Sequence, residues 1–130
     1  MSFPGFSEVR TRPARARLIH ARSGEAIATD VELALTRSSR RRGLLERDRL
    51  DPAAALVLSP CLAVHTAFMR FAIDVIFVDK AGHVTRIVKR LEPWRAAASL
   101  RAYATIELAA GALDRFDIAV GDRLLIAARN

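Results

Sequence analysis

Apolar and polar residues alternate along much of the chain, which is the pattern of half-buried β-strands. The alternation first covers residues 16–21 and, after a turn at Ser23-Gly24, it continues over residues 26–36. A short apolar run that ends at Ser59-Pro60 also predicts a buried strand. The same reasoning predicts strands over residues 55–58, 64–69, 105–108 and 123–127.

The segment Phe71–Val78 is the most apolar part of the chain and predicts a central strand. Both of its faces are hydrophobic, so we expect both to be buried, as in a strand at the centre of a sheet. The connection Asp79-Lys80-Ala81-Gly82 follows, and Gly82 suits a positive φ beside a bulge. The chain then returns antiparallel over Val84–Leu91, where basic side chains indicate an edge strand.

Two short helices are expected between the strands. The first begins at a cap provided by Thr36 or Ser38 and runs to about Leu45. The second lies within residues 109–117, after Gly111.

Counted together, these segments give about seven short strands and two short helices, with a long irregular loop that opens at residues 92–94. The chain is therefore expected to be mainly β, as a compact antiparallel barrel or sandwich. Residues 1–14, where prolines and a glycine break any regular pattern, are expected to form a flexible N-terminal arm. Residues 15–130 are expected to form a single β-rich domain.

The composition fits a globular protein with a water-facing surface. The chain has 130 residues, 52% of them hydrophobic and 27% charged, which excludes an intrinsically disordered chain. Polar residues and a proline interrupt the longest apolar-rich stretch, so no membrane-spanning helix is expected. Cys61 is the only cysteine, so no disulfide can form within the chain. Because the first residues lack an apolar export signal, we expect a cytoplasmic protein.

The formal net charge of +7 suggests nucleic acid as a binding partner. Of the 21 basic residues only Lys80 and Lys89 are lysines, and acidic residues are interleaved with the arginines. The densest basic run is Arg37–Arg49, but consecutive arginines on a helix point in different directions. We therefore favour a solvated basic face over a nucleic-acid site. Docking of nucleic acid or an acidic partner through this run stays as an alternative.

Cys61, His65 and Met69 have residue types and a spacing similar to those of blue-copper sites, and His20 would offer the upstream imidazole. In an extended chain four residues span about 13 Å, which separates Cys61 from His65 too far to share a metal ion. The same distance disfavours a thiolate–imidazole nucleophile pair. We therefore expect no metal, no other cofactor, and a small buried thiol at Cys61.

Asp74 is the most informative residue because it lies inside an apolar strand, where an unpaired carboxylate is costly. Two roles are open: a structural carboxylate that accepts backbone or arginine donors, or a residue in a pocket wall. Arg70 is four residues earlier, about 13 Å away in an extended chain, and cannot be the partner without a bend. Glu107 stands between Ile106 and Leu108, and the alternation predicts that it is solvated.

The segment Val64–Asp79, followed by Gly82, resembles the family catalogued as domain of unknown function 192. The resemblance covers most of residues 30–127. It implies a compact β-rich domain with a few short helices, and it supplies no accepted activity. The chain departs from the family at Ala72 and Ala109, where proline is usual, and at Ala67, where an aromatic residue is frequent. Supporting stretches are Arg42–Arg47, Pro60-Cys61, Glu107–Gly111 and Gly121-Asp122.

The leading functional hypothesis is a small non-enzymatic domain with a polar pocket that binds a small polar or anionic ligand. Arg70 would supply the charge and His65 the orientation. The alternative from another class is a hydrolase or transferase with Asp74 or Glu107 as general base and His65 as acid. Convergence of His65 with two carboxylates in one cleft would favour the enzyme. The expected ligand-binding residues are His65, Thr66, Arg70, Asp74 and Glu107.

Overall fold

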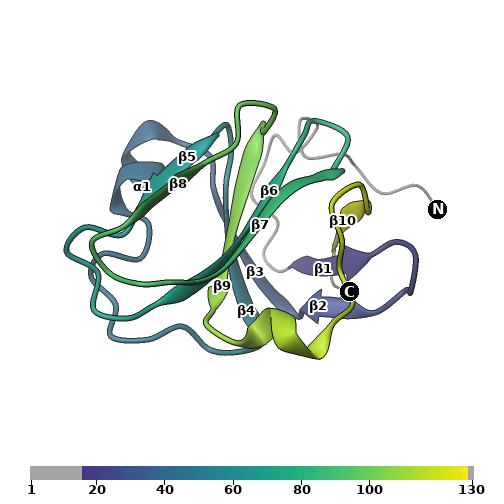
Figure 1. The fold of residues 1–130 in the computed structure, drawn as a ribbon, viewed down its shortest axis with the longest axis horizontal. Coiled ribbons are helices and arrows are strands. Elements are labelled where there is room, and N and C mark those ends of the chain that lie inside the picture. The colour runs from purple at the N-terminus through teal and green to yellow at the C-terminus, as the bar shows by residue number, and fades with distance from the viewer. Residues whose placement is uncertain (1–15, 129–130) are drawn as a thin grey trace.

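The computed structural model describes residues 16–128, which are mainly β. They form three sheets, with a short α-helix and a 3-10 helix between strands (Figure 1). The predicted N-terminal arm over residues 1–14 lies outside the described residues. The strands are β1 (Ala16–His20), β2 (Ala26–Ala28), β3 (Asp30–Ala34), β4 (Ala54–Leu58), β5 (Ala63–His65), β6 (Ile73–Val78), β7 (Val84–Leu91), β8 (Ala96–Ala98), β9 (Ala104–Ala109) and β10 (Leu124–Ala128), and the helices are α1 (Arg37–Arg42) and η2 (Ala112–Arg115).

A five-stranded sheet with the order β3-β4-β9-β6-β7 forms the middle of the molecule (Figure 1). β3 and β4 are parallel, and the other neighbouring pairs are antiparallel. All six residues of β6 are buried, and β6 pairs with β9 on one side and β7 on the other. The predicted central strand is therefore confirmed. β7 lies at the edge of the sheet as predicted, and Gly82 before it has a φ of 90°.

Two hydrophobic cores lie on opposite faces of this sheet, because successive residues of a strand point to opposite faces. On one face, Ile76 belongs to the same buried cluster as Leu18 of the three-stranded sheet β10-β1-β2. On the other face, Phe77 belongs to the cluster that contains Val64 of the two-stranded ribbon β5-β8. No sheet within residues 16–128 closes into a barrel, so the layered, sandwich-like alternative describes the fold.

The helix α1 begins after Thr36, one of the two predicted caps. The Thr36 hydroxyl accepts the Ser39 N–H (3.1 Å), and the Ser39 hydroxyl accepts the Thr36 N–H (3.1 Å), which forms a capping box. The helix ends at Arg42, earlier than predicted, because Gly43 has a φ of 46° and donates its N–H to the Ser39 carbonyl. The second predicted helix is only the 3-10 helix η2. Neither helix of the described chain is long and apolar enough to cross a membrane.

Two predicted strands are wrong in extent, and one strand was not predicted. Residues 26–36 divide into β2 and β3, and the strand predicted over residues 64–69 ends at His65. There the chain turns: the Thr66 carbonyl accepts the Met69 N–H (3.1 Å), and Phe68 has a φ of 65°. The unpredicted β8 consists of three alanines, which offer no alternation, and it falls in the expected irregular loop.

Candidate functional site

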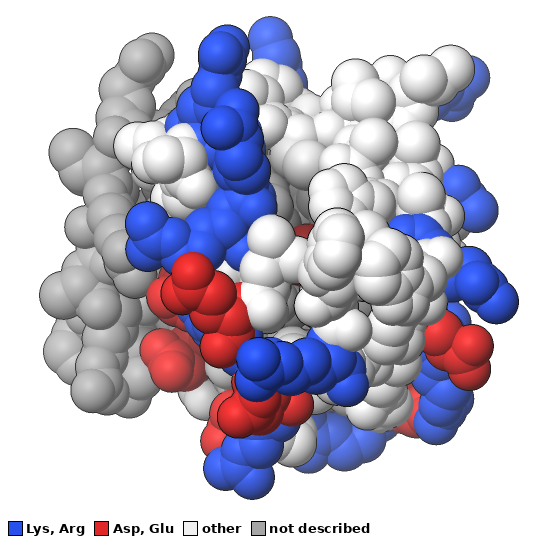
Figure 2. Space-filling model, turned by 90° about the vertical axis from the view of Figure 1, so that its left-hand side faces the viewer, with Lys and Arg blue, Asp and Glu red and all other residues white. Residues whose placement is uncertain are grey.

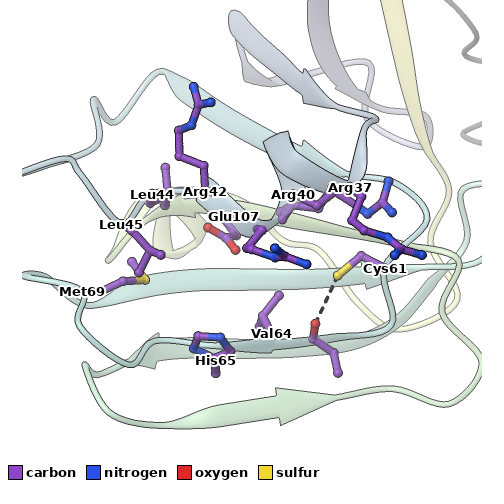
Figure 3. A pocket seen from close by; sticks show the side chains of 14 residues that line it. Arg37, Arg40, Arg42, Leu44, Leu45, Cys61, Val64, His65, Met69 and Glu107 are labelled. Atoms are coloured by element: carbon purple, nitrogen blue, oxygen red, sulfur yellow. Dashed lines mark hydrogen bonds between the residues drawn. The ribbon is translucent and has the colours of Figure 1, made fainter.

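A cavity of about 320 Å³ opens between α1 and β5, on the face of the five-stranded sheet that carries the second core. Figure 2 shows this side of the molecule, where basic side chains gather along one border of a hollow and uncharged side chains along the other. The apolar part of the wall includes Leu44, Leu45, Val64 and Met69 (Figure 3). Leu58 also lines the pocket. The pocket therefore combines a hydrophobic wall with a charged border.

Glu107 of β9 lies in the wall of this pocket (Figure 3). It pairs with Leu56 on one side and Val75 on the other, so its side chain projects from the middle of the sheet. Glu107 is only 5% exposed, and its buried Oε2 has no hydrogen-bond partner within residues 16–128. Burial raises the pKa of Glu107 to about 7, against the opposing effect of the charge on Arg47.

The prediction that Glu107 is solvated is therefore wrong. The alternation along β9 correctly places Glu107 on the face opposite to Ile106 and Leu108. That face is also covered, because α1 and the ribbon β5-β8 lie over it. A sequence pattern shows which residues share a face, but it does not show what a distant segment packs on that face.

The arginines of α1 form the basic border of the pocket. Arg40 is fixed in place, since its guanidinium donates to the carbonyl oxygens of Leu35 (2.9 Å) and, more weakly, Ser59 (3.4 Å). The other three arginines of the helix have no ion-pair partner within residues 16–128. These three guanidinium groups are therefore available to an anionic ligand.

His65 is the second predicted site residue that lines the pocket, where it is exposed at the end of β5. Cys61 and Met69 line the pocket as well. The Cys61 thiol donates to the carbonyl oxygen of Ala63 (3.1 Å). Within residues 16–128, no three residues of the types His, Cys, Asp and Glu lie close enough together to hold a metal ion.

Thr66 and Arg70 do not line the pocket. Thr66 is fully buried, and its hydroxyl donates to the Glu92 carbonyl (2.5 Å) and accepts the Arg95 N–H (2.8 Å), so it joins two loops. Arg70 is exposed and forms an ion pair with Asp48. Arg70 therefore does not supply the charge of the pocket, and the α1 arginines take that place.

Asp74 lies on the other face of the sheet from the pocket and is fully buried. Its carboxylate accepts three backbone N–H groups, from Arg90 (2.9 Å), Gly111 (3.1 Å) and Leu113 (3.0 Å). Of the two roles left open by the sequence, the geometry matches the structural carboxylate, because its donors come from the backbone of β7 and of the segment at η2. Asp74 and Glu107 do not converge in one cleft.

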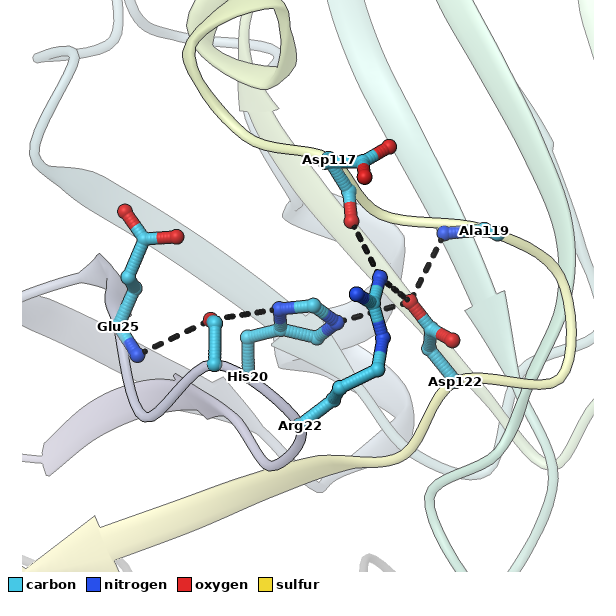
Figure 4. A network of polar contacts seen from close by, with 7 residues as sticks. His20, Arg22, Glu25, Asp117, Ala119 and Asp122 are labelled. Carbon is cyan, nitrogen blue, oxygen red and sulfur yellow. Dashed lines mark hydrogen bonds and ion pairs between the residues drawn. The ribbon is translucent and has the colours of Figure 1, made fainter.

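A polar network that the sequence did not reveal surrounds His20, which does not line the pocket (Figure 4). The imidazole is 1% exposed and contacts Ser23 Oγ through Nδ1 and Asp122 Oδ2 through Nε2, both at 2.8 Å. Asp122 also accepts from Arg22 (3.0 Å) and from the Ala119 N–H (3.0 Å). Hydrogen bonds from Arg22, Ala119 and His20 hold the pKa of Asp122 well below its usual value.

This network contains the residue types of a serine hydrolase triad, but its contacts indicate a structural clip. Ser23 Oγ already accepts the Glu25 N–H (3.2 Å), and none of these residues lines the pocket. The network joins the turn after β1 to the turn before β10, which are far apart in the sequence (Figure 4). The sequence could not reveal this network, because His20 and Asp122 are 102 residues apart and no sequence pattern links them.

Two solved structures share this fold. A protein from Sinorhizobium meliloti, described as a candidate transcription regulator, is 26% identical, with a TM-score of 0.73 over 90% of this chain and 97% of that chain. A protein of unknown function from Novosphingobium aromaticivorans is 18% identical, with a TM-score of 0.72 over 95% of this chain and 99% of that chain. The chain matches no curated protein.

One protein family matches nearly the whole described chain. The family named domain of unknown function 192 (DUF192, uncharacterized ACR) matches residues 18–126. This range includes the motif at residues 64–79 on which the resemblance was based, together with α1 and Glu107. The chain therefore belongs to the DUF192 family, whose activity is uncharacterised.

Proposed function

We propose that the pocket binds a small ligand that carries an anionic group at one end and a hydrogen-bond donor at the other. The anionic end contacts the α1 arginines, which have no acidic partner among the described residues. The donor reaches the carboxyl group of Glu107. The apolar body of the ligand packs against the hydrophobic wall, as is usual for small-molecule sites.

The observation that carries this proposal is the unpartnered Oε2 of Glu107. A buried carboxyl group without a partner is costly, and no hydrogen bond within the described residues uses this oxygen. A ligand donor supplies the missing hydrogen bond. Because burial brings the pKa of Glu107 to about 7, the carboxyl group is near the midpoint of its titration at neutral pH.

The separation of the two buried acids favours a binding domain over an acid–base enzyme. His65 and Glu107 both line the pocket, but Asp74 is engaged by three backbone donors elsewhere. Among the described residues that line the pocket, Glu107 is the only one with a carboxyl group. In an acid–base enzyme, Glu107 and His65 would therefore have to act as the general base and the general acid. No hydrogen bond joins these two side chains among the described contacts.

The test is thermal unfolding of the protein with three matched series of compounds: ω-hydroxycarboxylates of increasing length, the plain carboxylates, and the corresponding diols. A ligand present at about 100 times its Kd stabilises by about 2.7 kcal/mol. We expect the ω-hydroxycarboxylates to stabilise most, since they satisfy both ends of the pocket. We expect the diols, which lack the charge, to stabilise least.

Matched variants locate the binding. Glu107→Leu should abolish the preference for compounds with a hydroxyl group. The double variant R41Q/R42Q should weaken the binding of every carboxylate compound. The control R49Q/R101Q removes the same charge from exposed arginines outside the pocket and should behave like the wild type. Stabilisation by none of the compounds, or equal stabilisation of all variants, would refute the proposal.

Nucleic-acid docking is a second candidate function, and two observations support it. The relative from Sinorhizobium meliloti is described as a candidate transcription regulator. Arg41 and Arg42 are exposed on α1 and have no acidic partner in the described part of the chain. The control here is R17Q/R101Q, which removes the same charge from exposed arginines outside the basic run. Duplex DNA that binds R41Q/R42Q more weakly than R17Q/R101Q, with an affinity that falls steeply as salt rises, would favour this function over the small ligand.

A further inference from the structure

The strand β5 has a free edge, and the pocket lies beside it. β5 pairs with β8 alone in the described structure, so its second edge has no strand neighbour. Ala63, Val64 and His65, which make up β5, all line the pocket. A free strand edge offers a row of backbone donors and acceptors that can pair with another chain.

The hydrogen bonds at the two ends of the ribbon show which residues face this edge. The Leu62 carbonyl accepts the Ser99 N–H (2.9 Å), and Thr66 donates its N–H to the Arg95 carbonyl (2.8 Å). In an antiparallel ladder the bonded residues alternate with residues whose N–H and C=O point away. The backbone groups of Ala63 and His65 therefore point away from β8, toward the pocket side.

One of these groups already has a partner from the chain. The Ala63 carbonyl accepts the Cys61 thiol (3.1 Å), which is a weak donor. Within residues 16–128, no backbone hydrogen bond outside the ribbon engages the N–H groups of Ala63 and His65. Two donors spaced two residues apart are the pattern that an added strand requires.

We propose that the ligand of this pocket is the C-terminal end of an extended peptide, which pairs with the free edge of β5 and places its carboxylate on the α1 arginines. This inference rests on the proposed function and names its ligand. The cavity of about 320 Å³ is at the small end of ligand pockets, so it accepts the end of a chain rather than a chain that passes through. Side chains of a paired strand alternate in direction, so one of them faces the pocket wall at Glu107.

The charge of the border selects this occupant over a basic one. The α1 arginines without ion-pair partners match a terminal carboxylate, and they repel a lysine- or arginine-rich segment. A polar side chain with a hydroxyl or amino group next to the terminus would donate to Glu107. The favoured peptides therefore have a free acid end, an extended backbone and a donor side chain that faces Glu107.

The test measures the binding of short fluorescent peptides to the protein by fluorescence anisotropy. One library of peptides has free acid ends, and a second library has the same sequences with amidated ends. We expect the best free acids to bind at least about tenfold more tightly than their amides. Methylation of the peptide nitrogens one at a time should then weaken binding by about tenfold at alternate positions only. Methylation without effect at every position would overturn strand pairing.

Variants of the protein test the edge directly. Ala63→Pro removes an N–H group that faces the pocket and takes no part in the ladder with β8. This variant should bind the peptide about tenfold more weakly than the wild type. Ala96→Pro makes the same change on the opposite edge of the ribbon, outside the pocket, and should leave peptide binding unchanged. Equal affinity of both variants would overturn the proposal.

The remaining outcomes separate this inference from the proposed function. Binding of the ω-hydroxycarboxylates without binding of any free-acid peptide would refute the peptide and leave the small-ligand pocket intact. Failure of both classes would refute both. Self-association of the protein in sedimentation experiments, lost in Ala63→Pro and kept in Ala96→Pro, would assign the edge to a second copy of the chain and overturn the peptide proposal.

Discussion

Asp74 and Glu107 are buried acids on neighbouring strands of the central sheet, and they face opposite cores. Asp74 accepts three backbone N–H groups, whereas Oε2 of Glu107 accepts no hydrogen bond from the part of the chain that the structure describes. The first arrangement completes the fold, because it satisfies donors at β7 and η2. The second leaves Oε2 as a buried polar atom without a partner among the described residues, in a side chain that lines the pocket, so Glu107 is the residue to which we assign the donor of the ligand.

Removal of the Asp74 carboxylate should destabilise the protein strongly. Asp74→Ala leaves three N–H groups without their acceptor, of which that of Leu113 is buried and those of Arg90 and Gly111 are partly buried, and we expect a loss of roughly 3–5 kcal/mol in the free energy of unfolding. Denaturant unfolding measures it. Asp117→Ala changes an exposed aspartate and should cost less than about 0.5 kcal/mol. Similar losses in the two variants would contradict the structural role of Asp74.

The pKa of Glu107 should appear in the pH dependence of stability. Because its pKa rises from 4.5 to about 7 on folding, the folded state binds the proton more tightly between these values. The wild type should therefore lose up to about 3 kcal/mol relative to Glu107→Gln as the pH rises through this window, with no further change above it. Parallel stability curves for the two proteins would show that the carboxyl group is not buried.

At the scale of elements, the short helix α1 holds the arginines of the pocket, and its stability depends on its cap. Thr36→Ala removes the hydroxyl of the capping box and should cost about 1 kcal/mol. Ser38→Ala removes a hydroxyl that contacts Thr36 only at 3.4 Å and is the matched control. Hydrogen exchange at the Arg40 and Gly43 amides, which close the helix, should accelerate in Thr36→Ala alone. Equal exchange in both variants would refute this.

Elements with strong sequence signals were predicted, and those with weak signals were not. The apolar run of β6 and the cap of α1 depend on residues within the segment itself, and the structure confirms both predictions. The three alanines of β8 have no alternation and depend on pairing with β5. The turn after His65 depends on Thr66, whose partners Glu92 and Arg95 are distant in the sequence.

At the scale of the whole molecule, contacts between distant segments decide where the site lies. The sequence indicated a mainly β fold and pointed to Asp74 and His65 as unusual residues. It could not indicate that α1 and the ribbon β5-β8 cover Glu107, because this depends on how layers assemble. Of the five predicted site residues, His65 and Glu107 meet at the pocket, and the other three are engaged elsewhere.

The clip at Asp122 should make the fold sensitive to acid. The pKa of Asp122 is held well below its usual value, so its stabilising effect is present above pH 4 or so and is lost as the pH falls below the ordinary value near 3.8. Asp122→Asn should therefore unfold at a lower temperature than the wild type at neutral pH, and the difference should shrink in acid. A difference that does not change with pH would contradict the network.

The most direct test of the central claim is a pH titration of the Glu107 side-chain carboxyl carbon by NMR, with and without an ω-hydroxycarboxylate. We predict a midpoint near 7 in the free protein and a resonance that moves when the compound is added and saturates. A midpoint near the ordinary value of 4.5, or a resonance that no carboxylate moves, would contradict the claim that Glu107 is the unpartnered acid of a ligand pocket.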